Sequence, residues 1–259
     1  MNIIIGDIGN TVTKICLINE KSFVIKKKIS LSSEEILTTN IFKKKINKFL
    51  KNEILSSISL FSSVVPKYNK IIKIFLKKIY KIKLVEIKEN KVKKIINLNI
   101  VNKNQLGSDR IANSVGVYKK YKTNCIVVDF GTATTFDVVT KKGSYIGGVI
   151  APGVNLSIKT LTVSADQIPF FSIKRQKKII GKNTREALNS GFYWGYSGLI
   201  NNIISKIEKG TQKKYKVIFT GGYADLFKTS IKRTFTVDKN ITISGIIEIY
   251  KKNIRNLIK

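Results

Sequence analysis

One motif occurs twice in this chain, and the spacing of its two copies limits the fold more than any other feature. Near the N-terminus an apolar segment runs into Asp7-Ile8-Gly9-Asn10-Thr11, and later another runs into Asp129-Phe130-Gly131-Thr132. A run rich in β-branched residues follows each glycine, which predicts a strand, a tight turn and a second strand in both places. The second copy comes almost half of the 259-residue chain after the first. A period this long indicates two copies of one domain, because solenoid repeats are far shorter.

The segments around the two copies predict an α/β chain in which strands come first and helices follow in each half. Further strands are predicted over residues 58–65, 145–149 and 216–220, and helices over residues 33–50, 67–81, 107–120, 156–161, 183–207 and 243–257. We expect two related lobes with a cleft between them, an N-terminal lobe of residues 1–115 and a C-terminal lobe of residues 116–259.

Composition excludes several classes of protein. The chain has no histidine, which rules out His-based catalytic triads and His-ligated metal sites. Cys16 and Cys125 each lie in an apolar, strand-like run, so we expect both to be reduced core residues. Lys or Asn interrupts every apolar run before it could cross a bilayer, and the N-terminus lacks the features of a signal peptide. We therefore expect a cytoplasmic protein with no membrane partner.

The net charge of +32 permits two interpretations. A positive surface attracts nucleic acids, anionic membranes and phosphorylated ligands. Alternatively, Lys, Ile and Asn have increased together, as happens in proteins encoded by AT-rich genomes. The excess is mostly Lys rather than Arg and is spread along the whole chain, whereas nucleic-acid-binding proteins usually group Arg with aromatic residues on one face. These features favour the second interpretation, and we expect no specific nucleic-acid partner.

Each Asp-x-Gly turn has the composition of a phosphate-binding turn. The glycine allows the backbone to approach a ligand closely, and exposed N–H groups in such a turn bind phosphate oxygens. The carboxylate of Asp7 or Asp129 can hold a hard cation or its water shell. A single turn of this kind is usually structural, but here two occur in a duplication, and Thr220-Gly221-Gly222 follows a third predicted strand. Together they favour a nucleotide site.

Two further segments contain residues suited to ligand binding. Gly107-Ser108-Asp109-Arg110 stands at the start of a predicted helix, where a carboxylate can accept a substrate proton while the guanidinium holds an anionic group. The alternative is an N-cap aspartate beside a surface arginine. Gly181-Lys182-Asn183-Thr184 is not a Walker A loop, because position 176 is Gln where that loop requires its first glycine.

Taken in order along the chain, these motifs resemble those of type III pantothenate kinase, a family of the actin-like, sugar-kinase and Hsp70 superfamily. The resemblance covers nearly the whole chain, is weakest over residues 20–100, and rests on the set of motifs rather than on any one. The matching motifs are Asp7-Ile8-Gly9-Asn10-Thr11, Ser62-Ser63-Val64-Val65-Pro66, Gly107-Ser108-Asp109-Arg110-Ile111-Ala112-Asn113, Asp129-Phe130-Gly131-Thr132-Ala133-Thr134-Thr135-Phe136-Asp137, Gly147-Gly148-Val149-Ile150-Ala151-Pro152-Gly153, Gly181-Lys182-Asn183-Thr184 and Gly191.

The resemblance implies a fold, an activity and a set of cofactors. The fold would be two duplicated ribonuclease-H-like lobes of the actin-like ATPase type, with the nucleotide in the cleft between them. The activity would be ATP-dependent phosphorylation of pantothenate to 4′-phosphopantothenate, the first step of coenzyme A biosynthesis. Members of the family use ATP, Mg²⁺ and a monovalent cation, K⁺ or NH₄⁺, and are homodimers that bind pantothenate at the subunit interface. Because phosphoryl transfer depends on positioning and charge neutralisation, the absence of histidine is no obstacle.

The resemblance also assigns roles to individual residues. Asp109 matches the general base, Asp129 matches the ligand of the monovalent cation, and Thr132 matches an ATP contact. Asp7 would lie near Mg²⁺. The pantothenate contacts would be Gly107, Ser108, Asp109, Arg110 and Thr184. The first phosphate-binding loop would be Asp7, Ile8, Gly9, Asn10, Thr11, Val12, Thr13 and Lys14.

One position departs from the family pattern. The family usually has a Tyr seven residues before the Gly of the Gly-x-Asp-Arg motif, where it touches pantothenate, and this chain has Ile100 there. Ile100 therefore keeps open a sister kinase for another hydroxy acid, and the positive charge keeps open a non-catalytic regulatory or nucleic-acid-binding protein on the same fold. The presence of Asp7, Asp109 and Asp129 favours an enzyme, because a regulator has no need of all three.

Overall fold

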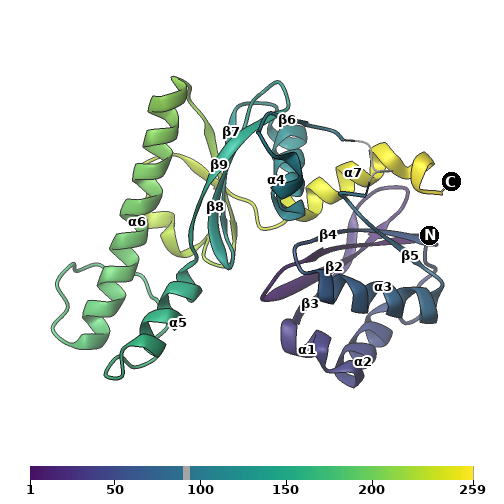
Figure 1. The fold of residues 1–259 in the computed structure, drawn as a ribbon, viewed down its shortest axis with the longest axis horizontal. Coiled ribbons are helices and arrows are strands. Elements are labelled where there is room, and N and C mark those ends of the chain that lie inside the picture. Colours follow the sequence, from purple (N-terminus) through teal and green to yellow (C-terminus); the bar gives the residue numbers. More distant parts are fainter. Residues whose placement is uncertain (90–93, 259) are drawn as a thin grey trace. The chain divides into compact units, whose positions relative to one another are not determined.

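The computed structural model describes residues 1–89 and 94–258, which form two compact units (Figure 1). The first unit comprises Met1–Lys120 and the C-terminal segment from Asn240, and the second comprises Tyr121–Lys239. Helix α7 (Ile241–Ile258) therefore belongs to the first unit, although it follows the second in the chain. The division into duplicated lobes at residue 115 stays a prediction.

Close helix packing explains why α7 belongs to the first unit. Helices α4 (Ser108–Tyr121) and α7 approach each other so closely that a Cβ atom on Gly245 would overlap the carbonyl oxygen of Ala112. In the same way, a Cβ atom on Gly116 would lie 2.5 Å from the carbonyl oxygen of Ile241. Glycine at these two positions allows the backbones of the two helices to touch.

The first unit contains a mixed five-stranded sheet in the order β3-β2-β1-β4-β5. Strand β1 pairs antiparallel with β2 and parallel with β4, and β5 extends the parallel part. The strands are β1 Asn2–Ile8, β2 Val12–Asn19, β3 Ile25–Ser32, β4 Ile58–Ser63 and β5 Lys83–Glu86. The other elements are α1 Ser33–Leu37, α2 Thr39–Leu50, α3 Pro66–Tyr80, the two-residue strand β6 Asn97–Leu98 and the 3₁₀ helix η1 Lys103–Gln105.

Local sequence sets the ends of these helices. Ser32 and Glu35 form a capping box at the start of α1, in which each side chain accepts a backbone N–H of the other residue. Pro66 occupies the first turn of α3, where a missing N–H removes no helical hydrogen bond. The single helix predicted over residues 33–50 is two helices, because Thr38 is extended, with φ −84° and ψ 90°.

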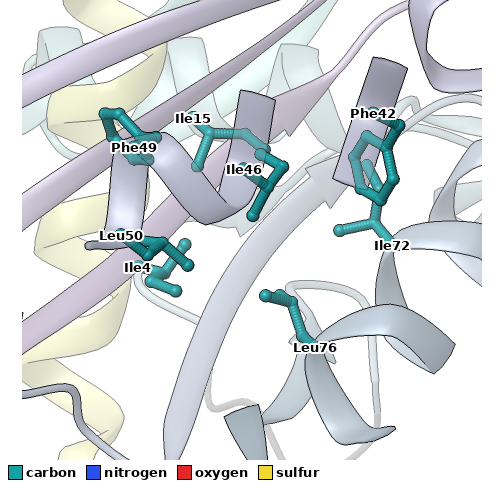
Figure 2. Close-up of a pocket in the computed structure, with 8 residues that line it drawn as sticks. All are labelled: Ile4, Ile15, Phe42, Ile46, Phe49, Leu50, Ile72 and Leu76. Carbon is teal, nitrogen blue, oxygen red and sulfur yellow. The ribbon is translucent and has the colours of Figure 1, made fainter. Parts of the chain in front are cut away.

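Apolar side chains from the sheet and from α2 and α3 form the core of the first unit (Figure 2). A cavity of about 10 Å³ remains among them, at the lower limit of the space that one water molecule needs. Since its lining is entirely apolar, we expect the cavity to be dry. The lining residues are Ile4, Ile15, Phe42, Ile46, Phe49, Leu50, Ile72 and Leu76.

Within the second unit the sheet has the order β11-β10-β7-β8-β9. Strand β10 is parallel to β7 and β11, whereas β7, β8 and β9 are antiparallel. The strands are β7 Cys125–Phe130, β8 Ala133–Val139, β9 Ser144–Pro152, β10 Lys216–Gly221 and β11 Phe235–Val237. The helices are α5 Val154–Ser164, the long α6 Thr184–Thr211 and the 3₁₀ helix η2 Leu226–Thr229 (Figure 1).

The strands and helices predicted from the sequence are present, with shifted ends, and four strands were not predicted. Strand β3 lies at the sheet edge and carries three consecutive lysines, so its apolar signal is weak. Strands β5, β6 and β11 are too short to give a pattern. Both cysteines are buried and unpaired, as predicted. Among the described residues, no helix has the length and hydropathy required to cross a bilayer.

Candidate active site

Three parallel strands of the first unit end at the same edge of the sheet. Asp7 on β1 lies beside Ser62 on β4, and the Val64 N–H donates to the carbonyl oxygen of Ile8 at 3.0 Å. On the other side of β4, the Ile87 N–H donates to the carbonyl oxygen of Phe61 at 3.0 Å. Open α/β sheets bind their ligands beyond the carboxyl ends of the strands. This edge is therefore the candidate site of the first unit.

The turn after β1 exposes its backbone at this edge. The Gly9 N–H donates to the carbonyl oxygen of Val12 at 3.2 Å, and Asn10 and Thr11 are exposed. Ser33, the first residue of α1, fixes the turn: its hydroxyl donates to the carbonyl oxygen of Asn10 at 2.5 Å, and its N–H donates to that of Thr11 at 3.3 Å. These two hydrogen bonds tie the turn to the start of α1.

The residues of the predicted first phosphate loop divide into exposed and buried positions. Ile8 and Thr13 are fully buried, so their side chains support the turn from within the core. Lys14 is half-buried and is the cross-strand partner of Asp7 on β1. Cross-strand partners project from the same face of a sheet, so an ammonium and a carboxylate lie beside the turn. Lys14 is therefore distinct from the exposed lysines elsewhere on the chain.

The segment Gly107-Ser108-Asp109-Arg110 begins α4 at the same edge. Ser108 is almost fully buried, and its hydroxyl donates to the carbonyl oxygen of Ser63 at 2.6 Å and accepts the Ser63 N–H at 3.2 Å. Ser63 is the last residue of β4 and pairs with Ile8. The predicted substrate segment and the predicted phosphate turn are therefore both fixed to the end of β4.

Asp109 lies in the first turn of α4, and its surroundings favour a role as a base. Its Oδ1 accepts the backbone N–H of Arg110 at 2.8 Å. A Cβ atom on Gly107 would overlap this oxygen, so only glycine there leaves room for the carboxylate. Burial raises the pKa of Asp109 from its ordinary value, while the Arg110 N–H and charge and the charge of Lys88 oppose this rise. A carboxylate whose pKa is raised accepts a proton more readily near neutral pH.

The second Asp-x-Gly turn is one residue shorter than the first. Strand β7 ends at Phe130 and β8 begins at Ala133, whereas β1 ends at Ile8 and β2 begins at Val12. The Gly131 N–H donates to the carbonyl oxygen of Ala133 at 3.1 Å. The two Asp-x-Gly segments therefore correspond position by position up to the glycine. After the glycine, the second segment is offset by one residue.

The duplication also includes one buried threonine in each hairpin. These two threonines correspond once the one-residue difference in turn length is taken into account. Thr13 pairs with Ile8 in the first hairpin, and Thr134 pairs with Phe130 in the second. Both threonines are fully buried, and within the described residues neither hydroxyl has a hydrogen-bond partner. The two hairpins thus repeat in side-chain detail, which the sequence motif alone had not revealed.

Two glycines pack against the second turn. Gly221, at the end of β10, has φ +85°, and a Cβ atom there would lie 2.7 Å from Oδ1 of Asp129 and 2.5 Å from the carbonyl oxygen of Phe130. A Cβ atom on Gly153 would overlap the carbonyl oxygen of Thr132. The backbone of these glycines therefore lies directly against Asp129 and Thr132, the two residues predicted to bind the cation and ATP.

Thr184 begins α6 in the second unit and is exposed, whereas Asp109 belongs to the first unit. The preceding segment is a helix cap. Asn183 accepts the Glu186 N–H at 2.9 Å, and the Glu186 carboxylate accepts the Lys182 N–H at 2.9 Å. These N–H groups are already used within the cap, and the exclusion of a Walker A loop rests on Gln176 in the sequence.

Sequence reasoning missed two residues beside the substrate segment. Glu86 ends β5, and burial raises its pKa although its carboxylate accepts the Lys88 N–H at 2.7 Å. The Lys88 ammonium donates to the carbonyl oxygens of Asn104 and Leu106 at 2.8 and 2.9 Å. Nothing in the sequence distinguishes Lys88, because Lys and Arg together number 48.

The carboxylates of the two turns fit the metal ions that the sequence predicts. Among the described residues, no three His, Cys, Asp or Glu side chains form a metal-binding cluster. Mg²⁺ in nucleotide sites needs only one or two protein carboxylates, since phosphates and water supply its other ligands. Asp7, beside an exposed turn, fits that requirement. Asp129, beside the Phe130 carbonyl oxygen, offers the hard oxygen donors that a monovalent cation takes.

The sequence matches the profile of the type III pantothenate kinase family over residues 3–206. It is 50% identical over 245 residues to the type III pantothenate kinase of Pelagibacter ubique strain HTCC1062, covering 95% of this chain and 97% of the relative. It is 38% identical over 200 residues to the type III pantothenate kinase of Koribacter versatilis strain Ellin345, covering 77% of this chain and 73% of the relative.

Solved structures resemble the fold at low sequence identity. A conserved Campylobacter jejuni protein, named for the Baf family of transcriptional activators, superposes with a TM-score of 0.62 at 21% identity over 98% of this chain and 100% of its own. The activator of 2-hydroxyisocaproyl-CoA dehydratase from Clostridium difficile, with bound ADPNP, superposes with a TM-score of 0.55 at 9% identity over 98% and 96%. These likenesses concern the fold alone, and they confirm the predicted α/β, actin-like class.

Proposed function

Since this chain belongs to the type III pantothenate kinase family and transfers a phosphoryl group from ATP to pantothenate, we propose that Asp109 is the general base of the reaction. The product is 4′-phosphopantothenate, and the reaction is the first step of coenzyme A biosynthesis. Membership of the family decides among the functions that the sequence left open, in favour of the kinase over a regulator and in favour of pantothenate over another hydroxy acid.

The environment of Asp109 carries this proposal. Its carboxylate is held at the carboxyl edge of β1, β4 and β5 by the Arg110 N–H, and burial raises its pKa. The other carboxylate placed at this edge by the motifs, Asp7, lies beside Lys14 and the exposed phosphate turn, where it suits a Mg²⁺ ligand. Of the two, Asp109 is better suited to accept a proton.

In the proposed reaction, the primary hydroxyl of pantothenate donates its proton to Asp109 while its oxygen bonds to the γ-phosphorus of ATP. The bond between that phosphorus and the bridging oxygen of the β-phosphate breaks, and ADP leaves with the electron pair. Bound Mg²⁺ supplies neutralisation of the phosphate charge, and Asp7 would hold it. Because such a transfer depends on position and charge, the main task of the chain is to fix the reacting groups.

The two turns would bind the phosphates and the monovalent cation. We assign the turn Gly9-Asn10-Thr11, in which Asn10 and Thr11 are exposed, together with Lys14 beside it, to the phosphates of ATP. In the second unit we assign Thr132 to a further ATP contact and Asp129 to K⁺ or NH₄⁺. The close approach of the Gly221 and Gly153 backbones to these two residues supports the assignment, since it fixes both in place.

The acid group of pantothenate needs a cation, and Arg110 is the proposed one. Its guanidinium can hold a carboxylate through two parallel hydrogen bonds. Gly107 and Ser108 would shape the segment, and Thr184 would add a hydroxyl. Ile100, which replaces the Tyr of the family, contributes apolar contact but no hydroxyl, so we expect weaker pantothenate binding than in relatives that have the Tyr.

We propose that the enzyme is a homodimer formed through α6. An open pocket of about 620 Å³ lies along α6 and is lined largely by apolar atoms. Gly191, Gly195 and Gly198 are exposed at helical spacing, and a Cβ atom on any of them would meet nothing within 4 Å. Since glycine weakens a helix, three on one exposed face favour the close approach of a second copy. A cytoplasmic location, where ATP is available, completes the proposal.

The first experiment is a coupled assay of ADP release with ATP, Mg²⁺ and K⁺, comparing pantothenate with no acceptor and with a set of other hydroxy acids. We expect turnover that requires both pantothenate and K⁺. Turnover with another acid but not with pantothenate would move the substrate while leaving the site. A folded protein that is silent with every acceptor would contradict the proposed reaction.

A further inference from the structure

A short turn after β5 lies against the segment that leads into α4. The backbone N–H of Glu86 donates to the Glu89 carboxylate at 3.1 Å, and the N–H of Glu89 donates to the Glu86 carbonyl oxygen at 3.0 Å. The Glu86 carboxylate accepts the Lys88 N–H at 2.7 Å. These three hydrogen bonds fix the backbone of the turn, and with it the direction in which the Lys88 side chain leaves.

The Lys88 side chain reaches two main-chain carbonyl oxygens directly before the substrate segment. Its ammonium donates to the Asn104 carbonyl at 2.8 Å and to the Leu106 carbonyl at 2.9 Å. Leu106 immediately precedes Gly107, and the Leu106 side chain is buried. Hydrogen bonds from a charged donor are stronger than neutral ones, so this contact holds the backbone firmly.

The geometry points to Lys88 as a positioning residue: we propose that its ammonium fixes the backbone before Gly107 and thereby the carboxylate of Asp109. This inference rests on the proposed function, in which Asp109 is the base. Lys88 itself touches neither substrate nor nucleotide in this proposal. It acts through residues 104–107, as Ser63 acts on the same segment through Ser108.

Two support points on either side of Gly107 make the arrangement specific. The Ser108 hydroxyl fixes the segment to β4 after the glycine, and Lys88 fixes it to the turn after β5 before the glycine. Gly107 lies between them without a side chain of its own to restrain it. The Gly107 carbonyl oxygen accepts the Ile111 N–H at 3.2 Å, so losing the Lys88 contact would release the backbone on the N-terminal side of the glycine, against which the Asp109 carboxylate lies.

Lys88 also acts on Asp109 through its charge. Its ammonium lowers the pKa of Asp109, against the rise that burial causes. Removing the charge should therefore raise the pKa of Asp109. The pH below which activity falls, the acid limb of the pH profile, should then rise as well. A residue that only stabilised the fold would leave this acid limb where it is.

The test compares Lys88→Met, Lys88→Gln and Lys88→Arg with the wild-type enzyme and with Lys83→Met, which removes an exposed lysine from the start of β5, the strand before this turn. For each, kcat and the KM for pantothenate are measured from pH 5 to pH 9, with the melting temperature as a check of folding. We expect kcat/KM to fall about ten- to a hundred-fold in the Met and Gln variants. We expect their acid limb to move to higher pH, and Lys88→Arg and Lys83→Met to behave like the wild type.

Two results would overturn the inference. One is a folded Lys88→Met or Lys88→Gln enzyme with the kcat/KM and acid limb of Lys83→Met. The other is a loss of activity that follows a lowered melting temperature, leaves the acid limb in place and is not rescued by Lys88→Arg. Asp109→Asn is measured in parallel: an inactive Asp109→Asn with an unaffected Lys88→Met refutes only the role of Lys88, whereas an active Asp109→Asn refutes the base and this inference together.

Discussion

The hydroxyl of Ser108 donates to the carbonyl oxygen of Ser63 at 2.6 Å and accepts the N–H of the same residue at 3.2 Å. The Ser108 side chain thus supplies both a donor and an acceptor to the backbone of the last residue of β4. Because Ser63 also pairs with Ile8, the first phosphate turn and the start of α4 share one support.

Ser108→Ala should destabilise the protein. The substitution removes the hydroxyl that donates to the Ser63 carbonyl oxygen and accepts the Ser63 N–H, and losing these two hydrogen bonds costs about 1–3 kcal/mol. We expect urea unfolding to show this loss and kcat/KM for pantothenate to fall, because α4 is no longer fixed at its first turn. Ser22→Ala, in an exposed turn, is the control. A Ser108→Ala protein as stable as Ser22→Ala would show that water replaces the hydroxyl.

Asp109→Asn should abolish turnover. The amide keeps the size of the carboxylate and can still accept the Arg110 N–H, but it cannot accept the substrate proton. We expect kcat to fall by about 10²–10⁴-fold with ATP binding largely intact. Steady-state kinetics and nucleotide titration measure the two quantities, and Asp166→Asn, at an exposed position, serves as the matched control. A near-normal kcat would remove Asp109 from the role of base.

The same substitution should stabilise the fold at neutral pH. Burial raises the pKa of Asp109 in the folded chain, so the folded state holds the proton up to a higher pH than the unfolded state does. Stability is therefore lost as the pH rises from the unfolded pKa, about 3.9, through the raised folded value. Asn carries no such charge. We expect Asp109→Asn to melt about 1–3 °C above the wild type at pH 7 and to lose this advantage near pH 4. An equal difference at both pH values would point to packing instead.

Asp129→Ala should weaken the response to potassium. Removing the carboxylate takes away the negative charge beside the Phe130 carbonyl, so a monovalent cation should bind less tightly there. We expect lower activity in Asp129→Ala and a K⁺ titration that is flattened or absent, measured against choline chloride at constant ionic strength. If activation by K⁺ survived unchanged, the cation would have to bind elsewhere.

Gly195→Gln should break the dimer without harming the subunit. A Cβ atom at Gly195 meets nothing within 4 Å, and replacing glycine favours the helix by about 0.5–1 kcal/mol. A second copy packed against α6 would leave no room for the longer side chain. We expect light scattering to report a monomer for Gly195→Gln and a dimer for Gly210→Gln, whose Cβ also meets nothing within 4 Å near the end of the same helix. A dimer in both variants would place the interface elsewhere.

The sequence by itself determined the duplicated hairpins and the residues that carry the chemistry. Asp7-Ile8-Gly9 and Asp129-Phe130-Gly131 were recognisable because apolar strands and glycine turns are local properties, decided by sterics within a few residues. The predicted Asp109 segment stands at the start of a helix for the same local reason. The match to a known family added the substrate, which no local pattern contains.

Only the tertiary structure decided what supports these residues. That Ser108 bonds to Ser63, and that Lys88 bonds to the carbonyl before Gly107, depends on β4, β5 and α4 meeting at one edge of a sheet. Lys88 is one lysine among many in the sequence, and only the position of its partners distinguishes it. The alignment of Thr13 with Thr134 likewise appears only in the strand register, because the second turn is one residue shorter. Contacts between distant segments are set by the packing of the whole sheet, so they cannot be read from local pattern.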